Sequence, residues 1–236
     1  MLNPENKLLE KGFAVIESVY RDTEVDKIVR AVSSTDTSKD TFRKSKNLFA
    51  IRQCLKEIPA LLDLLLTDKL RQLIQMISAE IPFIIKSIYF DKPASSNWYV
   101  AYHQDLTISV NSKSDIEGFG PWTVKQKQFA VQPSLAILEN VFTLRIHLDD
   151  TDENNGALKV IPASHQKGIY RPETIDWQNE QEEICPVKKG GVMVMKPLLL
   201  HSSNRTTNQQ RRRVIHIEFA SLELPEPLKW AERISI

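Results

Sequence analysis

The chain has little cysteine, no long apolar run and no leader-like segment. Its 236 residues include only two cysteines, Cys54 and Cys185, which are too few for a disulfide framework and typical of a reducing compartment. No segment approaches the roughly 18 uninterrupted apolar residues that span a bilayer. Met1 is not followed by the basic and apolar stretches of a signal peptide. We therefore expect a cytoplasmic protein without a membrane partner.

The sequence also lacks an excess of charge and any linker. Lys and Arg number 31 against 30 Asp and Glu, so the net charge is +1 and no global field attracts nucleic acid. Repeats, low-complexity tracts and Gly/Ser linkers are absent, and 42% of residues are hydrophobic. This composition favours one domain, residues 1–236, over two small ones, with a small molecule as its partner and no oligomeric state specified.

Periodicity divides the chain into a helix-rich part, residues 1–82, and a strand-rich part, residues 83–236. Gly12–Ile16 predicts a short strand, while Asp22–Val32 and Pro59–Ser78 carry apolar residues at helical spacing. After residue 82, short β-branched and aromatic runs alternate with turns, as in an antiparallel sandwich or barrel. The candidate strands are Phe83–Phe90, Trp98–His103, Phe142–Leu148, Ala157–Ile161, Val192–Met195 and Arg213–Phe219.

Two segments between these strands are predicted to be long loops. Asn111–Gln132 contains Phe119, Trp122 and Phe129, and Ile169–Glu183 is polar with few apolar anchors. Long loops in a compact domain often act as lids. The aromatic side chains of the first loop either close over a substrate or pack against the sheet.

The tripeptide His103-Gln104-Asp105 follows a candidate strand. Because side chains alternate along a strand, His103 and Asp105 point to one side and Gln104 to the other. An imidazole and a carboxylate on one strand end are two ligands of the facial two-His, one-carboxylate site for non-haem Fe(II), which needs a third. Taken alone, the tripeptide is a weak signal and is more often an ordinary exposed pair.

His201 is the candidate third ligand, since a glycine turn and an apolar run lead to it. Arg212 follows 11 residues later, and we expect a hairpin to return the next strand beside His201, with Arg212 facing the metal. A planar guanidinium binds a carboxylate through two hydrogen bonds, as a site for a dicarboxylic 2-oxo acid requires. The alternatives are a structural histidine and, for Arg211–Arg213, a solvated basic edge.

Several tracts resemble the phytanoyl-CoA dioxygenase family of Fe(II)- and 2-oxoglutarate-dependent oxygenases. The tracts, which lie in the expected order and cover most of the chain, are Gly12–Ile16, Tyr102–Leu106, Leu148–His165 and His201–Ala220. The resemblance implies a mostly β fold with supporting helices, a double-stranded β-helix (a cupin-like jelly-roll). It also implies His103, Asp105 and His201 as iron ligands and Arg212 as the partner of the 2-oxoglutarate C5 carboxylate. Ser203 and Gln104 match further family positions near the cosubstrate.

The strand Phe142–Leu148 places its polar residues Thr143, Arg145 and His147 on one face. If this face lines the barrel, these side chains contact cosubstrate or substrate, and Thr143 and Arg145 are candidates for that role. The alternative is a satisfied buried polar cluster. Some relatives carry an aromatic residue where this chain has Arg145, so a relative's substrate preference does not carry over.

The resemblance implies a dioxygenase that uses Fe(II), 2-oxoglutarate and O2 to hydroxylate a C–H bond of a small organic metabolite, releasing succinate and CO2. Asp105 favours hydroxylation over halogenation, because halogenating relatives generally replace that carboxylate with a small residue. One alternative is a non-catalytic jelly-roll that serves as a metal-binding or interaction module. A zinc hydrolase is another, although it would have no use for Arg212 and Ser203.

Overall fold

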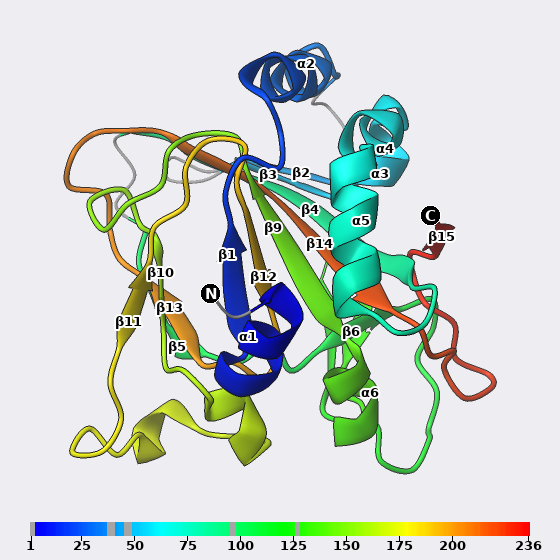
Figure 1. Cartoon of the computed structure of the whole chain (residues 1–236). Helices are drawn as coiled ribbons and strands as arrows, with labels where there is room; N and C mark the ends of the chain where they lie inside the picture. Colours follow the sequence, from blue (N-terminus) through cyan, green and yellow to red (C-terminus); the bar gives the residue numbers. More distant parts are fainter. Residues whose placement is uncertain (1–2, 37–40, 45–48, 95–97, 126–127) are drawn as a thin grey trace.

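The computed structural model describes residues 3–36, 41–44, 49–94, 98–125 and 128–236 (Figure 1). Most of its helices come early in the chain. The α-helices are α1 (Pro4–Lys11), α2 (Asp22–Ser33), α3 (Cys54–Glu57), α4 (Ala60–Leu65), α5 (Asp68–Ile77) and α6 (Leu135–Asn140). None of the helices in these ranges is both long and apolar enough to cross a membrane.

Within the described ranges the strands form three antiparallel sheets. The large sheet has the order β1 (Phe13–Ile16), β12 (Val192–Met195), β9 (Phe142–His147), β14 (Arg212–Ala220), β4 (Phe83–Lys92), β3 (Phe49–Arg52) and β2 (Phe42–Lys44), with β15 (Ile234–Ser235) also on β4. The four-stranded sheet has the order β11 (Glu183–Cys185), β10 (Leu158–Val160), β13 (His201–Ser203) and β5 (Val100–His103). A smaller sheet joins β6 (Ile108–Val110), β8 (Gln128–Val131) and β7 (Trp122–Lys125).

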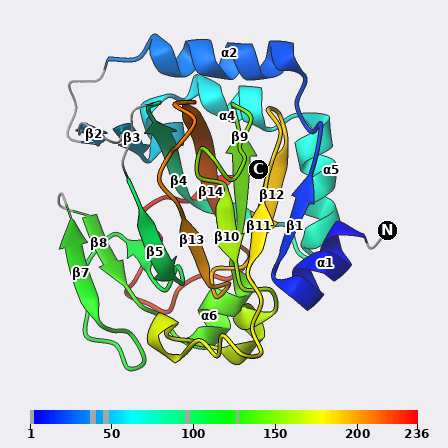
Figure 2. The same cartoon turned by 90° about the vertical axis from the view of Figure 1, so that its left-hand side faces the viewer.

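The large sheet and the four-stranded sheet face each other as the two layers of a jelly-roll, the fold class that the sequence predicts (Figures 1 and 2). Helices α3, α4 and α5 cover the opposite face of the large sheet (Figure 1). The outward residues of β14 are apolar (Ile215, Ile217 and Phe219) and pack in the core beneath these helices. The inward residues therefore form one wall of the space between the two sheets.

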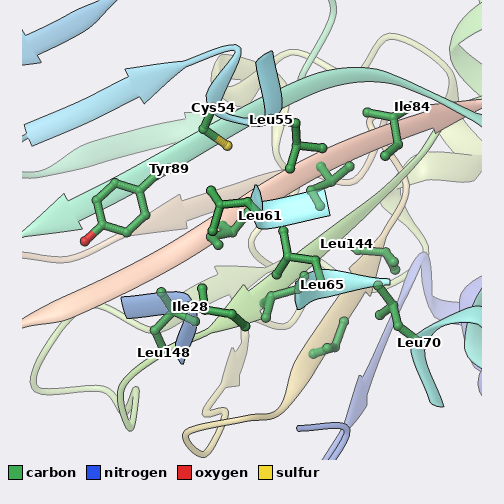
Figure 3. Close-up of a cluster of buried hydrophobic side chains, with 14 of the residues drawn as sticks. Ile28, Cys54, Leu55, Leu61, Leu65, Leu70, Ile84, Tyr89, Leu144 and Leu148 are labelled. Carbon is green, nitrogen blue, oxygen red and sulfur yellow. The ribbon is translucent and has the colours of Figure 1, made fainter. Parts of the chain in front are cut away.

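The main core lies between the helices and the large sheet (Figure 3). Leu61 and Leu65 lie one helical turn apart on α4, and together with Leu70 of α5 they are buried in the same core cluster as Leu144 of β9. Burying each side chain of this size contributes about 1.5–3 kcal/mol to the free energy of folding. This packing fixes the large sheet and therefore the positions of the residues on its other face. Cys54 belongs to this core, and its thiol is free.

The predicted strands after residue 82 and the helices at Asp22–Val32 and Pro59–Ser78 are present, the latter split into α4 and α5. Two expectations were wrong. Asn111–Gln132 is not an open loop, because it contains β7 and β8, and its three aromatic residues pack against a satellite core. The segment after His201 is not a hairpin, because β13 and β14 belong to different sheets.

Candidate functional site

Strand pairing brings two imidazoles together between the sheets. His103 ends β5 and lies opposite His201, which begins β13. Asp105 follows two residues after His103 and is held by a 2.9 Å hydrogen bond from its backbone N–H to the carbonyl of Pro197. Nε2 of His103 lies 3.9 Å and Nε2 of His201 3.8 Å from the Asp105 carboxylate oxygens. All three ligand atoms lie within 4.8 Å of one another, as a shared metal ion requires.

The protonation states in this cluster suit a cation. Nδ1 of His103 lies 2.9 Å from the carbonyl of Ala101, and Nδ1 of His201 lies 2.9 Å from that of Leu199. Because a carbonyl only accepts, each Nδ1 carries the proton and each Nε2 presents its lone pair to the cluster. Burial lowers the pKa of His201 to about 4, so the ring is neutral at pH 7. The donor set of two imidazoles and one carboxylate fits Fe(II).

A cavity of about 250 Å³ opens beside the three ligand atoms. Its walls come from both sheets, with β4, β9 and β14 on one side and β5, β10 and β13 on the other. The lining combines charged groups with an apolar set, Ile88, Phe90, Trp98, Val100 and Leu158. The arrangement is that of a small-molecule site, in which a few polar groups orient a ligand within an apolar pocket.

Arg212 enters the cavity from β14, on the sheet opposite His201. Its Nη1 donates to the carbonyl of Gly156 and lies 3.5 Å from Oγ of Ser203, which itself donates to that carbonyl at 2.9 Å. Gly156 has φ 88°, and a Cβ there would lie 2.9 Å from Nζ of Lys92. Glycine thus allows a guanidinium, an ammonium and a hydroxyl to gather within one small region.

The cations at this end of the cavity are shifted toward their neutral forms. Burial, and then the charge of Arg212, lower the pKa of Lys92 to about 8. Burial, and then the charge of Arg145, lower the pKa of Arg212. Lys92 has a 2.6 Å hydrogen bond to the carbonyl of Asn204, and no ion pair between described residues involves either Lys92 or Arg212. This end of the cavity therefore favours an incoming anion.

Of the polar residues predicted on β9, only Arg145 lines the cavity. Thr143 is buried on the same face but is not part of the lining, and its hydroxyl has no hydrogen-bond partner among the described residues. His147 is also buried, and its Nδ1 lies 2.8 Å from Oγ1 of Thr151. The polar face of β9 is thus present, but of its three polar residues only Arg145 reaches the cavity.

Gln104 is not at the cavity either. Its side chain donates to the carbonyls of Leu198 at 2.5 Å and Gly168 at 2.9 Å, and it accepts the backbone N–H of Tyr170 at 2.9 Å. The amide therefore ties the strand end that carries His103 to two neighbouring segments. Its geometry is that of a positioning residue.

The sequence analysis missed four ionisable residues of the cavity wall: Lys86 and Lys92 of β4, and His216 and Glu218 of β14. A signal for the two β14 residues was available in the sequence, because residues 215–219 alternate apolar and polar side chains, whereas β4 shows no such alternation. The same alternation on β9 had been interpreted as a polar inner face.

Comparison with known proteins identifies related sequences. A family model described as phytanoyl-CoA dioxygenase (PhyH) matches residues 8–214. Phytanoyl-CoA dioxygenase domain-containing protein 1 of Rattus norvegicus is 23% identical over 184 residues, which are 70% of this chain and 55% of that protein. The chain thus spans about half the length of this curated relative.

Solved structures share the fold at low identity. EctD from S. alaskensis, in its apoform, has a TM-score of 0.72 at 16% identity, over 94% of this chain and 78% of that one. The carbocyclase SnoK from nogalamycin biosynthesis, described as non-heme and alpha-ketoglutarate dependent, gives 0.68 at 15%, over 93% and 83%. HygX from Streptomyces hygroscopicus, with nickel and 2-oxoglutarate bound, gives 0.64 at 13%, over 90% and 84%. With the family model matching most of the sequence, this chain belongs to the phytanoyl-CoA dioxygenase family.

Proposed function

We propose that this protein is an Fe(II)- and 2-oxoglutarate-dependent dioxygenase that hydroxylates a C–H bond of a small organic metabolite. The observation that carries the proposal is one cavity lined by two imidazole Nε2 atoms, a carboxylate and, from the opposite sheet, Arg212 beside Ser203. Family membership supports it, as does the fold shared with HygX, whose structure contains nickel and 2-oxoglutarate.

Each group has a defined task in this proposal. His103, Asp105 and His201 would hold Fe(II), and Arg212 with Ser203 would hold the cosubstrate carboxylate remote from the metal. Bound together, Fe(II) and 2-oxoglutarate would activate O2, releasing succinate and CO2 while one oxygen atom enters the substrate C–H bond. The apolar lining, with Phe90 and Leu158 among its members, would exclude water and orient the substrate.

The cations of the cavity favour this proposal over its rivals. A zinc hydrolase needs the three ligands and a base, and it leaves Arg212 and Lys92 without a task. A non-catalytic metal-binding module does not require buried cations at one end of an apolar cavity, where each is destabilising without an anion. A dicarboxylate cosubstrate accounts for both the metal ligands and these cations.

The test is an anaerobic titration of Fe(II) and then 2-oxoglutarate into metal-free protein. We expect a weak visible charge-transfer band that needs both additions, since it arises from chelation of the metal by the 2-oxo acid. In Arg212→Ala the band should require at least tenfold more 2-oxoglutarate, because one charge-assisted bidentate contact is lost. Arg233→Ala is the matched control, as Arg233 pairs with Glu223 and is not among the cavity-lining residues.

Three results separate the proposal from its rivals. Folded, iron-loaded protein that gives no band with 2-oxoglutarate contradicts the dioxygenase proposal and favours the binding module. A band that is equally strong in Arg212→Ala removes the assigned role of this arginine. Zinc-dependent hydrolysis without the band would favour the hydrolase.

The cytoplasm is the location that we propose for this activity. The thiols of Cys54 and Cys185 are both free and buried, which agrees with a reducing compartment. Fractionation of cells that express the protein should recover it with cytoplasmic markers, and recovery with an extracellular or membrane fraction would contradict the proposal.

A further inference from the structure

A row of hydrogen-bonded polar side chains crosses the wall of the cavity beside the metal cluster. Nζ of Lys86 lies 2.8 Å from Oε1 of Glu218, the same oxygen lies 3.0 Å from Nε2 of His216, and Nδ1 of His216 lies 3.3 Å from Nη1 of Arg145. All four residues line the cavity. The row begins with an ion pair and ends on a guanidinium.

The chemistry of the row fixes the state of His216. A guanidinium only donates hydrogen bonds, so Nδ1 of His216 must accept, and a carboxylate only accepts, so Nε2 must carry the proton. The hydrogen bond to Glu218 thus sets the orientation of the ring. Nδ1 of His216 in turn accepts a hydrogen bond from Nη1 of Arg145, so the guanidinium is already oriented in the absence of a ligand.

Arg145 has unused binding capacity. Its side chain is buried, with 8% of the residue exposed, and its Nε has no hydrogen-bond partner among the described residues. The ion pairs between described residues do not include it. A buried, unpaired guanidinium is destabilising, which is a feature of sites built to receive an anion.

Counting charges indicates which ligand supplies that anion. The described side chains that line the cavity include four cations (Lys86, Lys92, Arg145 and Arg212) and two anions (Asp105 and Glu218). Fe(II) and the 2-oxoglutarate dianion add charges that cancel. Asp105 is near enough to act electrostatically on Arg145, but in the proposed site its carboxylate binds the metal. With the metal chelating one carboxylate of the cosubstrate and Arg212 holding the other, Arg145 still lacks an ion-pair partner. The remaining ligand is the organic substrate.

We propose that Arg145 binds a carboxylate of the organic substrate, so that the protein acts on a small organic acid. This inference rests on the proposed function and names its substrate class. The guanidinium fork matches a carboxylate, and the apolar lining of the cavity, including Ile88, Phe90 and Val100, offers room for a short hydrocarbon portion. Arg145 is then a specificity-determining residue, held in place by His216 and Glu218.

The test is binding of straight-chain monocarboxylates of two to eight carbons, each compared with the primary amide of the same chain. The protein is loaded with Ni(II), which does not turn over, and with 2-oxoglutarate, and binding is followed by calorimetry. We expect at least one acid to bind tenfold or more tightly than its amide. Arg145→Gln should abolish this preference while leaving the affinity for 2-oxoglutarate within about threefold. Arg145→Lys should retain part of the preference through its charge.

Controls separate this inference from the proposed function. Arg233→Gln removes the same charge outside the cavity lining and should behave as the parent protein. If Ni(II) and 2-oxoglutarate fail to bind, the dioxygenase proposal itself is contradicted, and with it the inference that rests on it. If both bind but no acid binds more tightly than its amide, only the substrate class is wrong. If Arg145→Gln weakens 2-oxoglutarate as much as Arg212→Ala does, Arg145 is a cosubstrate residue and the inference is overturned.

Discussion

Single residues in the cavity show how burial prepares a side chain for a ligand. Lys92 is 3% exposed and has a hydrogen bond to one backbone carbonyl, while Arg212 is its cationic neighbour and carries a second buried charge. Water that would otherwise stabilise these charges is excluded, so their charged forms are destabilised until an anion binds. The same physical effect that weakens the fold locally strengthens binding.

Lys92 should make the affinity for 2-oxoglutarate depend on pH. Its pKa is lowered to about 8 in the free protein, by burial first and Arg212 second. Below pH 8 the ammonium is charged and attracts the cosubstrate, and as the pH rises above about 8 this attraction is lost. We expect the Kd for 2-oxoglutarate to rise several-fold between pH 7.5 and 9.5, measured by anaerobic titration with Fe(II) replaced by Ni(II).

Lys92→Met is the matched variant for this prediction, because methionine keeps most of the side-chain length without a charge. Its Kd should be higher than that of the parent protein at pH 7.5 and should rise less steeply up to pH 9.5, since the titration of the Lys92 ammonium is removed. An equally steep dependence in Lys92→Met would assign the titration to another group.

Among the structural elements, the paired strands β5 and β13 determine the metal cluster. Their register places His103 opposite His201, and alternation along the chain returns Asp105 to the same side. Sequence reasoning predicted His103 and Asp105 from strand periodicity, which is local, and predicted His201 from the apolar run before it and from the family resemblance. It failed for the path to Arg212, because the choice between a hairpin and a crossover to the other sheet depends on packing of the whole barrel.

Other elements escaped prediction for similar physical reasons. β2 and β3 have only three and four residues, and β2 lies at one edge of the large sheet, so neither run is long enough to show a periodic pattern. The predicted strand Phe83–Phe90 ends before Lys92, whereas β4 continues to Lys92 because its pairing with β14 extends to Arg212. Side chains such as Lys92, His216 and Glu218 are stable there only through partners brought from distant parts of the sequence.

Gln104 should matter through the elements that it connects. Gln104→Leu leaves the carbonyls of Leu198 and Gly168 and the N–H of Tyr170 without their partner. Each buried group left unsatisfied costs about 1–3 kcal/mol, so we expect the free energy of unfolding in urea to fall by about 2–4 kcal/mol. The Kd for Ni(II) should rise as well, because Gln104 holds the strand end between His103 and Asp105.

Gln72→Leu is the control for that variant. Gln72 is an exposed residue of α5, so its replacement by leucine should change the free energy of unfolding by less than about 0.5 kcal/mol. If Gln104→Leu lowers stability but leaves the Kd for Ni(II) unchanged, Gln104 is part of the scaffold alone.

On the scale of the whole molecule, the site lies between two sheets that are stabilised unequally. The large sheet packs on a helical layer, whereas the four-stranded sheet supplies two of the metal ligands and shares a smaller apolar cluster with β1 and β12 of the large sheet. Ligands that contact both sheets at once would connect these layers. The cosubstrate as proposed does so, since the metal ligands lie on or beside β5 and β13 and Arg212 lies on β14.

This arrangement predicts ordered effects on the melting temperature. A ligand at 100 times its Kd stabilises a folded protein by about 2.7 kcal/mol, which raises the melting temperature of a chain of this size by about 5–10 °C. We expect Ni(II) alone to raise it and 2-oxoglutarate to raise it further only after Ni(II). His201→Ala should lose both increments, whereas Arg212→Ala should keep the first and lose the second. An increment from 2-oxoglutarate that survives in both variants would mean that the cosubstrate does not bridge the sheets, and the cations of the cavity would then need another anion.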